Sequence, residues 1–504
     1  MRKCLIFAAA LCLLLSGCGP AVQPEPTPSP TAAPPPEAAE FALAWYPGAS
    51  LHPITGDNRT NLTLGGLLYE GLYALDGQFQ PEPCLCTGGA ASEDGLSWTF
   101  TLRSGVTFSD GSPLTAAEAA ASLELARTSP LYAARLADIT GVAAGEGSVT
   151  LTLSRPNGAL PALLDIPIVK ETGGAPLGTG PYVLTGEGEG AALAARTGWW
   201  KGAQLPLETI PLRPIQEADD LIHAFDTRDV ALVSTDLTGT NALGFSGSFD
   251  TVDYPTSTML YVGFNLASGP CRDAGVRQAL SRAFDRSSVA TVLYARHAQA
   301  AALPLSPASP LYPEELAEEL EYAPQAAEAL LEGAGWTRRD GGWVSGRQTL
   351  ALTLLAPADN SARTAAAEHL AAGLENLGLS VTLELLPWTD YLAALERGDF
   401  DLYIGEVRLT ADFDLTALLS PGGSLNYGGY ADQEALQRLD GFRAASGQGR
   451  DLSALRLCQR LAEEPPFAVL CFKNWSVLTQ WSRIRGMTPT QANVFHAFDQ
   501  WGLT

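Results

Sequence analysis

Basic residues are scarce in this 504-residue chain. Lysine and arginine together number 31 against 55 aspartates and glutamates, which gives a formal net charge of −24 at pH 7. Such a surface repels phosphate backbones and anionic lipid head groups. The charge balance therefore disfavours nucleic acid as a partner, and it also favours solubility.

Histidine is rarer still, and the motifs of common hydrolases and nucleotide-binding enzymes are missing. The sequence contains no H-E-x-x-H, no G-x-S-x-G and no G-x-x-x-x-G-K-[ST]. The five histidines are scattered, as lone structural histidines are: His52, His223, His297, His369 and His496. We therefore predict a protein that is not an enzyme and has no cofactor. A surface hydrolase and a sensory receptor are the alternatives of another class.

Cysteine is too infrequent for a disulfide framework. Of eight cysteines, three lie in the first 18 residues, and five remain in the body of the chain: Cys84, Cys86, Cys271, Cys458 and Cys471. An odd number cannot all pair within one chain, so we expect mostly small apolar core residues with at most one or two bridges. The C-x-C pair invites a metal interpretation but lacks a second pair, and we predict no metal site.

No apolar run is long enough to span a membrane. After Met1, Arg2 and Lys3, the apolar stretch covers residues 4–15, which is typical of a signal peptide spanning residues 1–17. The sequence Leu15-Ser16-Gly17-Cys18 resembles the bacterial lipobox, and this resemblance implies a lipid on Cys18. The proline-rich residues 18–40 predict a semi-rigid tether that holds an extracytoplasmic protein at the cell membrane.

The rest of the chain is long for one compact domain and alternates strand and helix patterns. Period-two patterning predicts strands over residues 97–103, 149–153, 350–354 and 381–385. Helical patterning predicts helices over residues 115–127, 273–297, 324–333, 361–377 and 389–397, the first opened by a Thr115–Glu118 capping box. The pattern indicates an α/β protein of two or three lobes.

Five segments, in order along the chain, resemble one family. The first reads GLLYEGLYALDGQFQPEPCLC and continues through SEDGLSWTFTLRSGVTFSDGSPLTAAEAAASLE; GTGPYVL and YVGFNLASGPCRDAGVRQALSRAFDRSSV follow, then ALLEGAGW and LLPWTDYLAALERGDFDLYIGE. They are similar to the family 5 extracytoplasmic solute-binding proteins of ABC transporters, the oligopeptide and dipeptide class. The resemblance covers the chain from about residue 41 onward.

This resemblance implies a periplasmic-binding-protein-like architecture with two large lobes around a ligand cleft and an extra inserted lobe. Lobe I would combine residues 41–72, 176–256 and 485–504. Lobe II would be an insertion over 73–175, and lobe III would cover 257–484. Hinge closure would enclose the ligand.

For the ligand site, the resemblance singles out one carboxylate. In RLTADFDLTALLS, Asp412 occupies the position of the family's acidic residue that meets a peptide's amino terminus, although the proline that often follows is replaced here by Asp414-Leu415-Thr416. A desolvated ammonium needs such a partner. A solvated loop acid or a helix cap is the competing interpretation.

Aromatic side chains near the expected cleft are further candidates. Trp388 and Tyr391 stand where a strand enters a helix, with lobe packing as the alternative role. The remaining candidates are Trp45 and Tyr46 after the first strand, and Asn426 and Tyr427 after the LLSPGGS loop.

Together these features predict the binding component of an ABC importer that captures short peptides and delivers them to a permease. The expected protein is a monomer. The same architecture could bind an oligosaccharide, a nickel chelate or haem, because fold does not fix the solute.

Overall fold

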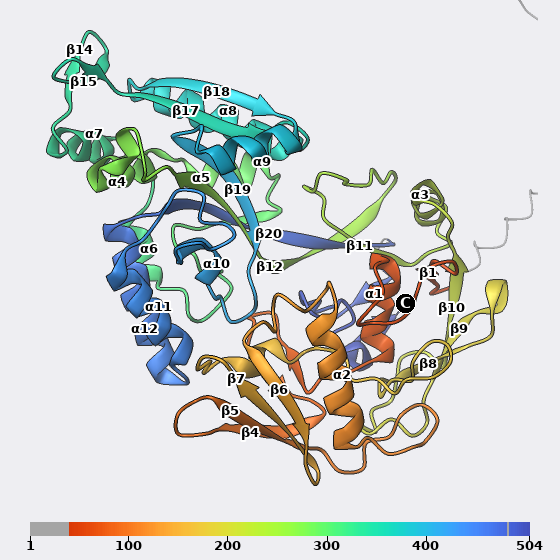
Figure 1. Cartoon of the computed structure of the whole chain (residues 1–504). Coiled ribbons are helices and arrows are strands. Elements are labelled where there is room, and N and C mark those ends of the chain that lie inside the picture. Colours follow the sequence, from red (N-terminus) through yellow and green to blue (C-terminus); the bar gives the residue numbers. More distant parts are fainter. Residues whose placement is uncertain (1–39, 481–482, 504) are drawn as a thin grey trace, which may run out of the picture. The chain divides into compact units, whose positions relative to one another are not determined.

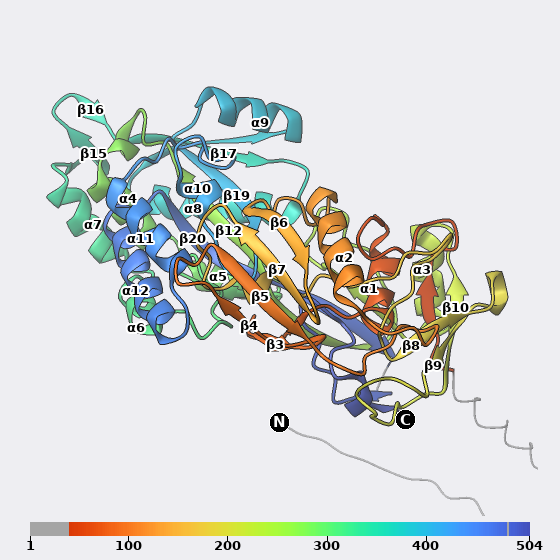
Figure 2. The ribbon, with the colours of Figure 1, turned by 60° about the horizontal axis from the view of Figure 1, so that its bottom comes forward.

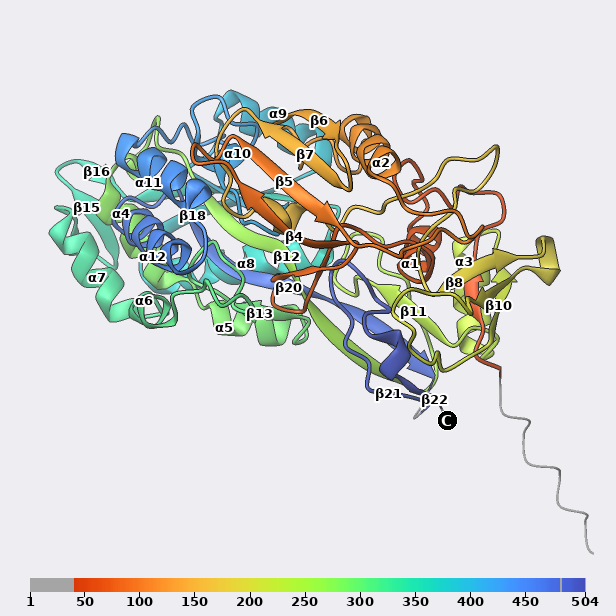
Figure 3. The same ribbon diagram turned by 90° about the horizontal axis from the view of Figure 1, so that it is seen from below.

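Two long strands pair along the centre of the chain's largest sheet. In this computed structural model, which describes residues 40–480 and 483–503, β12 (Phe249–Phe264) runs antiparallel to β20 (Phe467–Gln480). Figure 3 shows them side by side. The predicted signal peptide, the lipid site at Cys18 and nearly all of the tether lie outside the described residues.

The largest sheet has seven strands in the order β11-β20-β12-β19-β17-β18, with β13 paired to β20. Pairing is antiparallel from β11 to β19 and parallel between β17 and its neighbours β18 and β19. The further strands are β11 (Leu232–Thr235), β13 (Ala298–Ala300), β17 (Ala351–Pro357), β18 (Ser380–Leu386) and β19 (Leu402–Arg408). The strands predicted near 350 and 381 are confirmed.

Helices cover both sides of the β17 end of this sheet (Figure 1). Leu352 and Leu354 join the core beneath α8 (Ser361–Asn376), while Leu355 joins the core that contains Tyr391 and Leu395 of α9 (Trp388–Arg397). The other helices of this region are α4 (Ala274–Ala283), α5 (Arg286–Ser288), α6 (Glu314–Glu319), α7 (Pro324–Gly333), α10 (Thr416–Leu419), α11 (Gln433–Ala444) and α12 (Gln448–Glu463). A small sheet of β14 (Thr337–Arg339), β15 (Gly342–Ser345) and β16 (Gln348–Thr349) completes it.

A second sheet is built from the segment predicted as the insertion. Its four antiparallel strands, in the order β4-β5-β7-β6, are β4 (Cys86–Ala91), β5 (Ser97–Leu102), β6 (Ile139–Ala144) and β7 (Ser148–Leu153). The α2 helix (Ala116–Thr128) packs against β6 and β7 (Figure 2). Both halves of the Thr115–Glu118 capping box are present, as predicted. A hairpin of β2 (Tyr73–Leu75) and β3 (Pro81–Pro83) precedes this sheet.

A third sheet has the order β1-β10-β9-β8, with β1 (Leu43–Trp45) parallel to β10 (Thr209–Pro214). Helix α1 (Arg59–Leu68) packs against it. The remaining elements are β8 (Tyr182–Thr185), β9 (Ala192–Ala195), α3 (Ala218–Asp226), β21 (Ile484–Arg485) and β22 (Gly502–Leu503). The lobe boundaries remain a prediction, and β12 runs unbroken through the expected boundary at residue 256.

The single helix predicted over residues 273–297 is wrong. Helix α4 ends at Ala283, and Phe284 has an extended backbone. Asp285 accepts a hydrogen bond from the Ser288 N–H and starts a new short helix, followed by a π-helical turn over Val289–Leu293. The break lets the buried Arg286 guanidinium donate to the Val469 carbonyl at 2.7 Å. Side-chain capping by aspartate thus overrides the helical hydrophobic pattern.

The five described cysteines are free and buried. Cys84 and Cys86 lie in the core between the second and third sheets and their helices α2 and α1. Cys271 and Cys471 lie in the α8 core, and Cys458 lies in the α9 core. Burial raises the pKa of each thiol, so these side chains stay protonated. Their predicted role as small apolar core residues is confirmed.

A reciprocal pair of contacts locks β12 to β19. Tyr261 stands opposite Gly405, and Gly263 stands opposite Tyr403, so each ring covers the partner glycine. The two rings meet edge to face at 5.8 Å between centroids. Aromatic rings laid over cross-strand glycines fix strand register.

Gly263→Ala should therefore lower the free energy of unfolding by about 1–3 kcal/mol, because the added Cβ overlaps the Tyr403 ring. The matched control is Gly441→Ala in α11, where nothing lies within 4 Å of an added Cβ and stability should rise by up to about 1 kcal/mol. Urea denaturation measures both. Equal effects at the two sites would contradict this packing account.

Candidate functional site

The pairing of β12 with β20 changes register twice, between Pro255 and Met259 and between Leu260 and Tyr261. At the first of these shifts, the Thr256 hydroxyl donates to the Lys473 carbonyl at 2.7 Å. Ser257 donates its backbone N–H to Gln491 Oε1 at 2.6 Å. Such irregularities re-aim side chains and are frequent next to functional sites. We call this region, residues 254–258 with 472–476, the crossing.

A buried lysine sits at the crossing between two carboxylates. Lys473 Nζ lies 2.7 Å from Asp236 Oδ2, just after β11, and 3.5 Å from Glu406 Oε2 in β19. The lysine side chain is 1% exposed. A buried ammonium without carboxylate partners would be strongly unfavourable, so the structure must keep both contacts of Lys473. These contacts hold the end of β11, and the strand β19, in place against β20.

Two arginines approach the neighbouring ring of Trp475. The guanidinium carbon of Arg59, the first residue of α1, lies 3.4 Å from the Trp475 centroid, and that of Arg408, the last residue of β19, lies 5.5 Å from it. Both arginines are exposed to solvent, yet burial by surrounding protein lowers the pKa of each. A side chain that water reaches but protein surrounds is typical of a recess.

Further charged and ionisable side chains extend from the crossing towards the second sheet. Tyr254 Oη lies 3.0 Å from Ser234 Oγ, and the charge of Arg408 acts on both Tyr254 and Tyr132. Burial lowers the pKa of Arg135 to about 10, and the nearby charges of Asp412 and Arg408 also act on it. Groups from α1, the crossing, β19 and the segment after α2 therefore share one electrostatic environment.

Asp412 is the last of these charged side chains, and it is 5% exposed. One carboxylate oxygen accepts from Asn157 Nδ2 at 2.9 Å, the other accepts from the Thr410 hydroxyl, and the backbone carbonyl accepts from Arg450 at 2.6 Å. The next residue, Phe413, has a φ of 54°. The carboxylate is thus held by neutral donors, and it joins the segment after β7 to the segment after β19.

Further contacts tie the same two segments together. The Gly158 N–H donates to the Arg443 carbonyl at 2.7 Å, and a Cβ on Gly158 would overlap the Ala445 carbonyl. The Arg443 guanidinium, 4% exposed, pairs with Asp138 and also lies 3.2 Å from Asp414. Glycine is needed here because the backbones approach so closely.

The aromatic candidates of α9 differ in exposure. Trp388 is 46% exposed, stacks on Tyr391 at 5.6 Å and has the Arg363 guanidinium 5.8 Å from its ring. Tyr391 is buried, and its hydroxyl donates to the Ile404 carbonyl at 2.7 Å. In this structure Tyr391 supports Trp388, whereas the Trp388 ring is available to a ligand.

The loop candidates are also unequal. The Asn426 side chain is fully engaged, donating to the Ser420 and Tyr430 carbonyls and accepting from the Tyr430 N–H. Tyr427 is half-buried and meets Tyr403 edge to face at 5.9 Å. Asn426 therefore shapes the loop that presents Tyr427.

Trp45 and Tyr46 lie at the end of β1. The Trp45 Nε1 group is buried without a hydrogen-bond partner in the described structure. Tyr46 lines a cavity of about 270 Å³ together with Asn58, Arg59, Ser234 and Asn241. Of the sequence-predicted residues, only Tyr46 lines this cavity, which it shares with Arg59.

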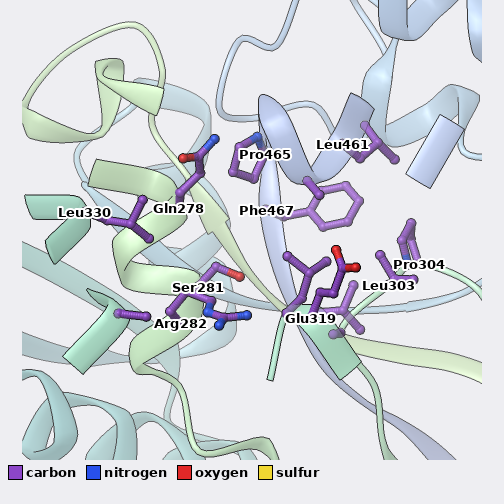
Figure 4. A pocket seen from close by; sticks show the side chains of 15 residues that line it. Gln278, Ser281, Arg282, Leu303, Pro304, Glu319, Leu330, Leu461, Pro465 and Phe467 are labelled. Carbon is purple, nitrogen blue, oxygen red and sulfur yellow. The ribbon is translucent and has the colours of Figure 1, made fainter. Parts of the chain in front are cut away.

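A second cavity, of about 310 Å³, lies apart from all seven predicted residues. Figure 4 shows it between α4, α12 and the start of β20, walled by Leu303, Leu461 and Phe467, with Arg282 and Glu319 as its charged groups. Its lining is mainly apolar and includes none of the groups of the crossing.

The sequence predictions missed Arg59, Arg408 and Trp475. Arg408 stands four residues before Asp412 in the same motif, so its place near the site could have been found from the sequence. No sequence pattern identifies Arg59 or Trp475 as site residues, because their contact depends on the tertiary arrangement of α1 and β20.

Within the described ranges, no three or more histidine, cysteine, aspartate or glutamate side chains are grouped so that they could hold a metal ion. None of the helices in residues 40–480 and 483–503 is long and apolar enough to cross a membrane.

The arrangement of sheets is that of extracytoplasmic solute-binding proteins. The solved structure of the periplasmic murein tripeptide binding protein MppA, in its unliganded open form, matches with a TM-score of 0.75 at 20% sequence identity, over 92% of this chain and 97% of that one. The predicted α/β, periplasmic-binding-protein-like fold is confirmed.

Residues 80–424 match the family described as bacterial extracellular solute-binding proteins, family 5 Middle, and the chain belongs to this family. The glutathione-binding protein GsiB of Salmonella typhimurium is 25% identical over 311 residues, 57% of this chain and 59% of that protein. This chain therefore matches less than two thirds of the length of that relative. Protein XP55 of Streptomyces lividans is 27% identical over 449 residues, 84% of this chain and 81% of that one.

The lysine of the crossing can be tested directly. Lys473→Met should lower the free energy of unfolding by about 3–5 kcal/mol, because it leaves Asp236 and Glu406 facing each other without a cation. Lys170→Met is the control: its Nζ–carboxylate distance is also 2.7 Å, but both partners are about one third exposed, and the loss should stay below about 1 kcal/mol. Similar losses in urea denaturation would contradict a special role for the buried triad.

Proposed function

We propose that this protein is the substrate-binding component of an ABC importer, that it captures short peptides by closure about the crossing, and that it passes them to a membrane permease. The protein binds its solute without chemical change. The solute binds the closed arrangement more tightly than the open one and stabilises it in proportion to that difference in affinity. The permease then recognises the closed protein.

Peptides are the favoured solute because of the relatives and because of Asp412. MppA is named for binding a murein tripeptide, and GsiB is named for binding glutathione, itself a tripeptide. Asp412 supports this assignment: its carboxylate has neutral donors at 2.9 Å or less and keeps further lone pairs for an ammonium. The peptide's amino terminus would approach Asp412 beside Asn157.

The aromatic candidates would form the walls of the same site. Trp388, supported by Tyr391, and Tyr427, held by the Asn426 loop, offer broad apolar surfaces with polar edges. Trp45 contributes an indole N–H that has no acceptor among the described residues. Such walls bind peptides without reading a particular sequence.

The proposed protein is a monomer that is anchored to the outer side of the cell membrane. A lipid on Cys18 and the tether of residues 18–40 would keep the binding unit near its permease. We expect the mature protein to begin, after removal of residues 1–17, with a diacylated or triacylated cysteine. Mass spectrometry of the protein isolated from membranes tests for this anchor.

The peptide assignment is tested by native mass spectrometry of the purified full-length chain with a tripeptide library and with the same library N-acetylated. Free-amino peptides should be retained and acetylated ones should not. Asp412→Asn should weaken retention at least tenfold, because the ammonium loses its counter-charge. Asp440→Asn, on the exposed side of α11, is the matched control and should leave retention unchanged.

Other outcomes separate the alternatives. Peptide retention that ignores both acetylation and Asp412→Asn would remove Asp412 from the site. A retained oligosaccharide or metal chelate would preserve the transport role and overturn the peptide assignment. Failure to retain any solute from peptide, glycan and chelate pools would contradict the importer proposal and favour a sensory role.

A further inference from the structure

The cavity beside α4 has no part in the proposed function, and its walls are well suited to an apolar ligand. It measures about 310 Å³ and is enclosed by α4, α6, α7, α12, the segment after β13 and the start of β20 (Figure 4). Leu303, Leu330, Leu461 and Phe467 supply much of its surface. Since an apolar cavity of about 150 Å³ can hold benzene, this one has room for a hydrocarbon group of roughly ten carbons.

One side of this cavity is polar and positively charged. Gln278, Ser281 and Arg282 are spaced three and four residues apart in α4, so they share one face of that helix. Figure 4 shows Arg282 and Leu330 on one side of the cavity and Phe467 on the other. Arg282 is half-buried. In residues 40–480 and 483–503, its guanidinium forms no ion pair with a carboxylate and donates no hydrogen bond to a protein acceptor.

A second arginine adds positive charge behind the same wall. Arg286 is 5% exposed, and it donates to the Val469 carbonyl at 2.7 Å and to the Ser281 hydroxyl at 3.0 Å, both of which belong to residues that line the cavity. These acceptors are neutral. Burial lowers the pKa of Arg286 to about 10, and the charge of Arg282 acts in the same direction, whereas Glu321 opposes it. An anion near the two guanidinium groups would therefore reduce their mutual repulsion.

We propose that this cavity is a second binding site, separate from the peptide site, for a medium-chain carboxylic acid. The hydrocarbon chain would lie against Leu303, Leu461 and Phe467, and Arg282 would bond the carboxylate. Burial of the chain supplies most of the affinity, because the hydrophobic effect grows with the apolar area removed from water. The guanidinium supplies the selectivity, because its planar fork of N–H donors matches both carboxylate oxygens.

The other charged residue of the lining does not favour a cationic ligand. Glu319 is exposed, so its carboxylate stays hydrated, whereas Arg282 is only half-exposed and Arg286 is buried behind it. An ammonium placed beside Arg282 would meet two like charges. The electrostatic environment of the inner wall therefore selects an anionic head group.

The test uses the purified full-length chain and three probes that share a ten-carbon chain: decanoate, decanol and decylammonium. Acetate is added as a carboxylate without the chain. Isothermal titration calorimetry at neutral pH measures the four affinities. We expect decanoate to bind at least tenfold more tightly than decanol and decylammonium, and acetate to show no measurable binding, because the chain and the carboxylate are both needed.

Substitutions assign the binding to the cavity. Arg282→Gln should reduce the affinity for decanoate to that for decanol and leave the affinity for decanol unchanged. Glu319→Gln should not weaken decanoate binding, since it removes a negative charge from the lining. Arg347→Gln, at an exposed arginine between β15 and β16, is the matched control and should change neither affinity.

Two further variants fill the cavity. Ala462→Phe in α12 and Ala326→Phe in α7 each add a ring to a half-buried lining position, so each should abolish binding of decanoate and decanol together. Thermal midpoints of the ligand-free variants show which of them keep the fold, and two positions on different helices make the test independent of either one.

Three results would overturn the inference. Decanoate binding that persists in both folded phenylalanine variants would place the ligand elsewhere. Decylammonium as the tightest probe, weakened by Glu319→Gln, would reverse the charge of the ligand. Equal affinities for decanoate and decanol, or binding of neither, would remove the carboxylate site. None of these results bears on peptide capture, because the cavity contains none of the groups of the crossing.

Discussion

The antiparallel pairing of β12 with β20 is the constraint on which the rest of the structure depends. These strands carry β11 on one side and β19 with β17 and β18 on the other, so they connect regions that otherwise have separate sheets and cores. The first of their two register shifts, between Pro255 and Met259, coincides with the buried Lys473 and the half-buried Trp475. A backbone that must remain paired on both sides of a break is a natural place for bending, because only a few dihedral angles need to change.

Positively charged side chains at the crossing lie in two contrasting environments. Lys473 is buried and meets two carboxylates, so its charge is balanced within the protein. Arg59 and Arg408 are close by but open to water, and they share an aromatic ring instead of a counter-ion. The first arrangement stabilises the fold whether or not a solute is present. The second leaves two guanidinium groups without a carboxylate partner among the described residues.

Local patterns predicted much of the fold. The α2 capping box, the strands near residues 97 and 149, and α7 and α9 follow from turn chemistry and periodicity that act over a few residues. The break after α4 could not be predicted that way, because it serves Arg286, whose acceptor is Val469 far along the chain. The site shows the same division. A local motif predicts Asp412 as a site residue. The contact between Arg59 and Trp475 joins residues 416 positions apart in the sequence, and no local pattern encodes it.

The most direct measurement is a crystal structure of the protein with the tightest-binding solute from its host's medium or a peptide pool. We expect electron density for the solute at the crossing, with its ammonium group at the Asp412 carboxylate beside Asn157. Density confined to the apolar cavity beside Phe467 and Arg282, with no solute atom near Asp412, would contradict this expectation.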